Sequence, residues 1–154
     1  MNGRDLVAQA NRLARATSRR PRQVDLNRAV SSAYYGLFHT LAKLAADTIV
    51  GVGADRSTAA WRQTYRALNH GLAKNACKQA QSRGFPACIV QFAEAFVDLQ
   101  ELRHSADYDP TAIFKRADVV ASIDLAEQAI FNLGMASRRD LRAFVALVML
   151  QERR

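Results

Sequence analysis

Hydrophobic residues recur at intervals of three and four positions along most of the chain, which is the period of an amphipathic α-helix. No segment shows the alternation of polar and apolar residues that is typical of a β-strand. Proline, glycine and polar clusters divide the pattern into six predicted helices. Their approximate ranges are 4–17, 21–50, 57–81 with an interruption allowed at Gly71, 86–108, 111–136 and 137–153. The pattern therefore predicts an all-α protein.

The predicted helix 86–108 is apolar on its inward stripe at first and polar on the same stripe near its end. Its inward positions are Ile89, Phe92, Ala93, Phe96 and Leu99, and then Arg103 and Asp107. An isolated charge is costly to bury, so an inward guanidinium must be paired or must face a cleft. The segment 102–110, in which Asp109-Pro110 ends the helix, is therefore the first place to look for function.

Length and composition predict one soluble domain. The 154 residues, 49% of them hydrophobic, suffice for a single hydrophobic core. No apolar run approaches the roughly 20 residues of a membrane span, and the N-terminus lacks an apolar signal region. Cys77 and Cys88 have neither the spacing of a metal clip nor the number of a disulfide framework. We therefore expect a single domain over 1–154, in the cytoplasm and without a membrane partner.

The net charge of +8 is unevenly distributed along the chain. Residues 1–28 carry +5, 29–85 carry +5, 86–136 carry −5 and 137–154 carry +3. This balance favours an anionic partner such as a nucleic acid, although a solvated basic surface without a partner explains it equally well. The acidic segment suggests a second surface, which would dock a basic partner or another copy of the chain.

The predicted helix 21–50 carries a polar and aromatic stripe beside its apolar one. The stripe comprises Arg28, Ser32, Tyr35, His39 and Ala42. One interpretation places Tyr35 and His39 at the edge of the core, where neighbours satisfy their polar atoms. The other makes this face a wall for a nucleotide, on which a base stacks and where His39 moves a proton near neutral pH.

Two segments together resemble a known family. They are Asn27-Arg28-Ala29 with Ala33-Tyr34-Tyr35-Gly36-Leu37-Phe38-His39, and Leu102-Arg103 with Ala106-Asp107-Tyr108-Asp109-Pro110. Their order, spacing and helix placement resemble the small single-domain HEPN proteins of bacteria and archaea, over about residues 1–136. The resemblance implies a homodimer and an up-and-down antiparallel bundle of four or five helices. Residues 137–154 lie outside the resemblance and are expected to form an extra C-terminal helix. It also implies action on RNA without a cofactor. Active members are metal-independent endoribonucleases, and many are toxins paired with a nucleotidyltransferase-like antitoxin.

The chain departs from the active-site motif of those ribonucleases. They carry an arginine followed, after four to six residues, by a histidine, whereas here four residues separate Arg103 from Tyr108. His104 points about 100° away from Arg103 around the helix, so it does not simply substitute. The Arg-x-x-x-Asp-Tyr form does occur in the subgroup that this chain resembles most. RNA cleavage is therefore one hypothesis, and a non-catalytic module that binds a nucleotide or a protein is the other.

Residue chemistry assigns roles under the first hypothesis. Cleavage needs a base for the 2′-hydroxyl, a cation for the phosphorane oxygens and an acid for the leaving 5′-oxygen. Arg103 fits the cation, unless it only forms an i,i+4 pair with Asp107 that locks the helix end. Candidates for base and acid are His39, His104, Asp107 and Tyr108, and those for nucleotide contact are Tyr35, Arg28 and His104. By resemblance, Tyr108 is also a candidate for nucleotidylation.

Two further signals are weaker. Glu101 and His104 match the Glu-x-x-His element of di-iron bundles, but the second copy and the extra inward carboxylates are missing, so we expect no metal. Arg66 and His70 lie one turn apart in the predicted helix 57–81. One interpretation is a solvated or packing pair. The other is that His70 lines the cleft near Arg103.

Overall fold

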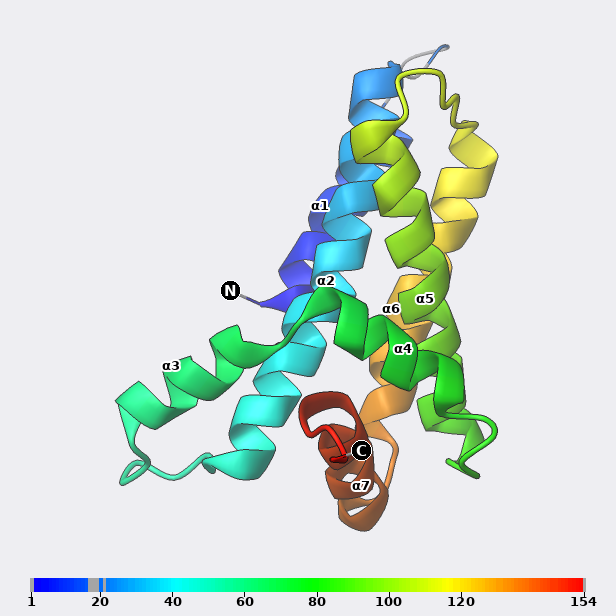
Figure 1. Cartoon of the computed structure of the whole chain (residues 1–154). Helices are drawn as coiled ribbons and strands as arrows, with labels where there is room; N and C mark the ends of the chain where they lie inside the picture. The colour runs from blue at the N-terminus through cyan, green and yellow to red at the C-terminus, as the bar shows by residue number, and fades with distance from the viewer. Residues whose placement is uncertain (1, 17–19, 21, 154) are drawn as a thin grey trace.

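The computed structural model describes residues 2–16, 20 and 22–153, and this part of the chain is all-α (Figure 1). It contains seven helices: α1 (Gly3–Arg15), α2 (Gln23–Ile49), α3 (Thr58–Ala67), α4 (His70–Gln79), α5 (Ala87–Tyr108), α6 (Arg116–Gly134) and α7 (Arg138–Met149). The predicted fold class, including the extra C-terminal helix, is confirmed.

Four of the helices form the bundle itself. In the view of Figure 1 the chain runs up α1, down α2, up α5 and down α6, and α2 packs against each of the other three. The segment that connects α2 to α5 contains α3 and α4, of which α3 projects from the bundle and α4 lies across α5. Helix α7 closes the lower end against α4 and α2.

The core lies where the hydrophobic pattern placed it. The predicted inward residues of α5 before Arg103 are all buried. On α6 the buried residues follow one helical stripe: Val119, Ile123, Ala126, Ile130 and Leu133. The largest fully buried side chains are Tyr34, Phe92, Phe96 and Phe144. Tyr34 is the exception among them because it brings a polar hydroxyl into the core, and a buried hydroxyl requires a partner.

Helices α1 and α2 cross at unusually close range at two glycines. A Cβ atom on Gly36 would lie 2.7 Å from Cγ2 of Val7 and 2.8 Å from the carbonyl oxygen of Gly3. Only glycine fits this crossing without moving one of the helices. The crossing fixes α1 against α2 one residue away from Tyr35.

The prediction of one helix over 57–81 is wrong in one respect, because the break falls at Leu68 and Asn69 and not at Gly71. Leu68 is extended, and the side chain of Asn69 accepts a hydrogen bond of 3.0 Å from the backbone N–H of Leu72. An asparagine cap of this kind starts a new helix. Arg66 therefore lies in the last turn of α3 while His70 begins α4, so they are not neighbours on one helix face.

Other helix ends also differ from the expectation. Residues 111–115 are not helical, since Asp109 Oδ1 accepts from the backbone N–H of Thr111 at 2.9 Å and Gln23 holds the backbone of Phe114. Helix α7 ends at Met149, four residues before the predicted end. The predicted boundaries at Thr17 and Pro21 lie outside the described residues.

No single helix of the described chain is both long and apolar enough to cross a membrane. Helices α6 and α7 reach that length and composition only as a pair, and the pair is bent by 119°.

Candidate functional site

Arg103 points inward from the last turns of α5, as its position on the stripe predicts, and its side chain is 14% exposed. Its Nη1 donates to the hydroxyl of Tyr35 at 3.2 Å and to Oδ2 of Asp107 at 3.3 Å. The guanidinium also lies 5.1 Å from the ring centroid of Tyr34 and 5.6 Å from that of Tyr35. Its buried Nε finds no hydrogen-bond partner among the described residues, nor does Nη2. The cation is thus held in place with donors to spare.

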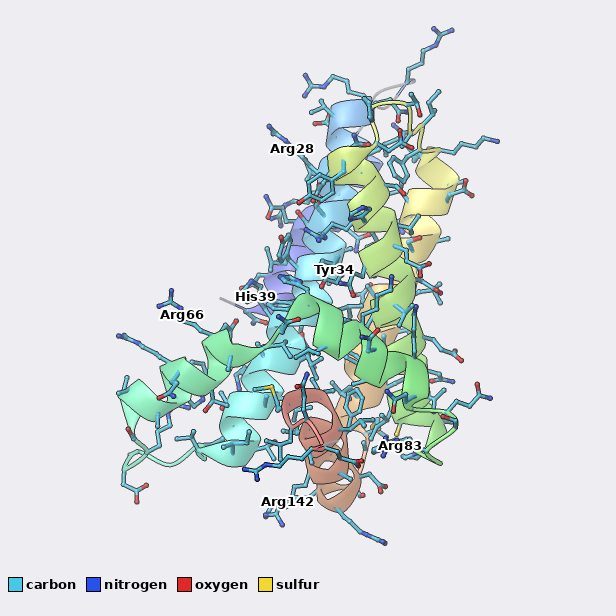
Figure 2. All side chains as sticks on the ribbon, in the orientation of Figure 1. Arg28, Tyr34, His39, Arg66, Arg83 and Arg142 are labelled. Carbon is cyan, nitrogen blue, oxygen red and sulfur yellow. The ribbon has the colours of Figure 1, made fainter. Side chains whose placement is uncertain are left out.

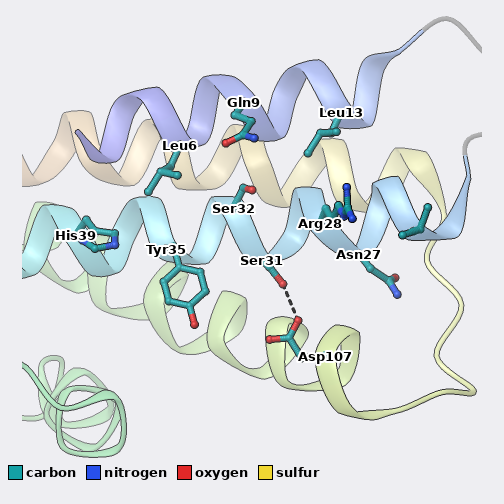
Figure 3. A pocket seen from close by; sticks show the side chains of 11 residues that line it. Leu6, Gln9, Leu13, Asn27, Arg28, Ser31, Ser32, Tyr35, His39 and Asp107 are labelled. Carbon is teal, nitrogen blue, oxygen red and sulfur yellow. Dashed lines mark hydrogen bonds between the residues drawn. The ribbon is translucent and has the colours of Figure 1, made fainter. Parts of the chain in front are cut away.

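Asp107 connects α5 to α2 as well as to Arg103. Its Oδ1 accepts a hydrogen bond of 2.8 Å from the hydroxyl of Ser31 (Figure 3). Its Oδ2 accepts from Nη1 of Arg103. The i,i+4 pair expected from the sequence is therefore present, but it also fixes the end of α5 to the polar stripe of α2. Asp107 positions the guanidinium, and Ser31 positions Asp107.

His70, the first residue of α4, lies beside this arginine. Its Nδ1 is 2.6 Å from the hydroxyl of Tyr34, and its ring stacks on Phe38 with 4.0 Å between centroids. Gln100 of α5 donates to the carbonyl oxygen of His70 at 3.1 Å, which fixes the start of α4 to the bundle. Burial lowers the pKa of His70, and the positive charges of Arg103 and His39 lower it further. The phenol pKa of Tyr34 is raised because the hydroxyl is buried.

His39 repeats this arrangement one helix away. Its Nδ1 is 2.5 Å from the hydroxyl of Tyr65 on α3, and the two rings stack 5.7 Å apart. Burial lowers the pKa of His39 and raises that of Tyr65. Both histidines thus have Nδ1 engaged by a tyrosine, whereas Nε2 bonds to no described residue. The ring of Tyr35 lies between 6.1 and 6.3 Å from both imidazoles.

A cleft of about 630 Å³ opens between α1, α2 and the end of α5. It brings together four predicted site residues: Arg28, Tyr35, His39 and Asp107 (Figure 3). The stripe on α2 is therefore the wall of a cleft, and its volume falls in the range of small-ligand sites. Arg103 does not line this cleft but reaches it through Tyr35 and Asp107.

The remaining predicted residues lie elsewhere. Tyr108 is 66% exposed, and His104 is exposed beside it with 4.9 Å between the ring centroids. Neither residue lines the cleft. Arg28 is exposed at one end of the cleft and forms no ion pair with the described residues. Figure 2 shows Arg28, His39 and Arg66 on the side of the bundle from which α3 projects.

Metal ligands are not grouped anywhere in the described residues, where no three His, Cys, Asp or Glu side chains lie close enough to hold an ion. Glu101, the acid of the Glu-x-x-His match, pairs instead with Lys74 at 3.3 Å. The functional groups at the site are a guanidinium, two imidazoles, several phenols and the carboxylate of Asp107.

Sequence reasoning missed Tyr34 and Tyr65 and gave His70 only a minor place. Tyr34 lies on the apolar stripe of α2, so the pattern predicts only that its side chain packs in the core. Tyr65 and His70 come from α3 and α4, which lie outside the four-helix bundle. Hydrophobic periodicity predicts that such helices form but not where they pack. The one available sign was Asn69, whose side chain caps α4 and so presents His70 to α2 and α5.

Comparison with known proteins finds no match to this chain, whether among protein-family models, curated proteins or solved structures.

Proposed function

We propose that this protein is a cytoplasmic, metal-independent endoribonuclease of the HEPN type. The observation that supports the proposal best is the grouping of Arg103 with His70, His39 and Tyr35. Nη2 of the arginine and Nε2 of each histidine have no hydrogen-bond partner among the described residues. This is a set of groups suited to phosphodiester cleavage without a metal.

In the proposed reaction the 2′-hydroxyl attacks the adjacent phosphorus and the bond from phosphorus to O5′ breaks. The products are a 2′,3′-cyclic phosphate and a 5′-hydroxyl. Nε2 of one histidine takes the proton of the 2′-hydroxyl, and Nε2 of the other gives a proton to O5′. Arg103 donates to the non-bridging oxygens, where negative charge develops.

The two histidines are assigned by their surroundings. Arg103 lowers the pKa of His70 and is not among the causes that act on His39. Because this additional positive charge disfavours the protonated form of His70, we assign His70 as the base. His39 lines the cleft and is assigned as the acid. Asp107 and Ser31 are positioning residues that act through Arg103.

The test is cleavage of an end-labelled single-stranded RNA by the full chain in EDTA. We expect the wild type to cleave and Arg103→Ala to lose at least about 100-fold in rate. Arg66→Ala is the matched control, because it removes the same charge from an exposed position on α3. An RNA that binds at the cleft but is not cleaved by the wild type would favour the non-catalytic alternative.

The motif resemblance supports a wider role for the protein as the toxin half of a pair, with a nucleotidyltransferase-like antitoxin. The exposure of Tyr108 is consistent with modification by that partner, since an enzyme reaches the ring without opening the fold. Co-expression with such an antitoxin should relieve toxicity and add a nucleotide to the peptide that contains Tyr108. An unmodified peptide in a non-toxic culture would remove this part of the proposal.

The same resemblance supports a homodimer. Sedimentation velocity on the full chain tests it, and a single species of 17.1 kDa at micromolar concentration would contradict it.

A further inference from the structure

A groove follows the seam between α5 and α6. Two adjoining hollows of about 400 and 520 Å³ form it, and they share Ala95, Asp98 and Leu125. On α5 the lining runs from Gln91 to Ser105, a length of about 21 Å at the rise of an α-helix. The groove is therefore long enough for about four turns of another helix.

The bottom of the groove is apolar. Ala95, Leu99, Leu102 and Ala129 line it, and Leu125 is 62% exposed at its centre. A leucine this exposed, in a groove with an apolar base, is a feature of surfaces that bind another apolar surface.

The rim is acidic. Glu94, Asp98 and Glu101 follow one another along α5, and the described lining contains no lysine or arginine. Glu101 pairs with Lys74, but Glu94 and Asp98 form no ion pair with the described residues and lie one turn apart, where like charges repel. Asp98 points about 140° away from Arg103 around α5, so this surface is separate from the candidate site.

We propose that this groove docks a cationic amphipathic helix of a partner protein. The apolar base takes the hydrophobic face of that helix, and the unpaired carboxylates take its lysines or arginines. RNA does not fit, because its phosphates meet a row of carboxylates. A second copy docked groove to groove does not fit either, because the two acidic rims would then face each other.

The probe is a synthetic four-turn helix of leucine and lysine, with the leucines on one face, titrated into the full chain and followed by fluorescence anisotropy. Two control peptides replace the leucines by serine or the lysines by glutamate. We expect only the leucine–lysine helix to bind, with NMR shifts at Ala95 and Leu125. Equal binding of the lysine–serine peptide, or shifts confined to other surfaces, would overturn the proposal.

Three variants localise the interaction. Asp98→Lys and Leu125→Ser should each weaken binding at least about tenfold, whereas Glu127→Lys, an exposed acid on α6 outside the groove, should change it less than about twofold. Circular dichroism checks that each variant is folded. If Asp98→Lys does not fold, Leu125→Ser still tests the proposal. Equal affinities for all three would refute the proposal, as would a dimer that Asp98→Lys dissociates. RNA cleavage by Asp98→Lys should be unchanged, so the outcome is independent of the proposed function.

Discussion

The two faces of α5 carry charge in opposite ways. On the face toward α2, one arginine is nearly buried and is held by a hydroxyl, a carboxylate and two aromatic rings. On the face toward the groove, Glu94 and Asp98 are exposed and no described residue pairs with them. Water solvates an exposed acid without help from the protein, whereas a buried cation persists only where the protein supplies partners.

That difference identifies the face of α5 toward α2 as the one whose residues are arranged around a specific charge. Tyr34, Tyr35, Ser31 and Asp107 come from two helices and converge on a single cation or its partners. A leucine at position 103 would continue the apolar stripe of α5 and would need no polar partners. We therefore expect changes on the Arg103 face of α5 to alter RNA cleavage, and changes on the groove face to leave it unaltered.

The largest expected effect follows from replacing Arg103 by the leucine that the stripe would favour. Arg103→Leu should reduce RNA cleavage about 1000-fold, because the cation at the phosphorane oxygens is lost. The fold should be retained or stabilised, since Asp107 keeps its bond to Ser31 and no buried charge is left unpaired. Single-turnover rates and urea denaturation measure the two effects. Full activity in Arg103→Leu would show that the arginine is structural.

His70→Gln should lower the cleavage rate about 100-fold near neutral pH by removing the base. In the wild type, the pKa values of both histidines are lowered, so the optimum should lie below about pH 6.5 and activity should fall as pH rises above it. The rate is measured from pH 4.5 to 8.5 in EDTA. An optimum above pH 8, or an unchanged profile in His70→Gln, contradicts the assignment.

Gly36→Ala should lower the free energy of unfolding by about 2 kcal/mol, because the new Cβ meets the backbone of Gly3 and the side chain of Val7. Gly134→Ala is the matched control at the end of α6, where a Cβ has no neighbour within 4 Å. Its effect should be neutral or slightly stabilising. Equal losses in the two variants would mean that the crossing of α1 and α2 is not tight.

Stability should also depend on pH through the histidines. Because the pKa of His70 and of His39 is lowered in the fold, the unfolded chain binds more protons between those values and about pH 6.5. This contribution to stability is complete above that pH and decreases as pH falls through the window. Urea denaturation at pH 7.5 and 5.5 should show the decrease, and His70→Gln should reduce it. Equal losses in the two proteins would place the effect elsewhere.

The smallest effect is expected at Ser31, which acts on Arg103 only through Asp107. Ser31→Ala removes the hydrogen bond that positions Asp107, and we expect the cleavage rate to fall about fivefold with little change in RNA affinity. Ser32 lines the same cleft, but its hydroxyl bonds to no described residue. Ser32→Ala should therefore leave the cleavage rate unchanged. A loss in Ser32→Ala equal to that in Ser31→Ala would exclude the positioning role.

Periodicity predicted the bundle because α5 and α6 bury their stripes almost wholly within it. The same signal predicted that Arg103 turns inward, but it left open whether the polar stripe of α2 lies at the edge of the core or faces a cleft. The misplaced break between α3 and α4 has a local cause, since the asparagine cap at Asn69 favours a new helix more strongly than Gly71 favours an end.

The rest of the site was not predictable from one sequence. Tyr65 and His70 reach α2 only because of the angle at which α3 and α4 cross the bundle, and no residue pattern encodes that angle. Tyr108 shows the converse: its motif position suggested the cleft, but one residue of rotation beyond Asp107 places its ring in solvent.

The most direct test of the central claim is the chemistry of the product ends when the full chain cleaves a defined single-stranded RNA in EDTA. Mass spectrometry should find a 2′,3′-cyclic phosphate and a 5′-hydroxyl. A single 2′-deoxy substitution at the cleaved position should stop the reaction, and so should Arg103→Leu. Products with a 5′-phosphate, or cleavage that continues past the 2′-deoxy residue, would contradict the account.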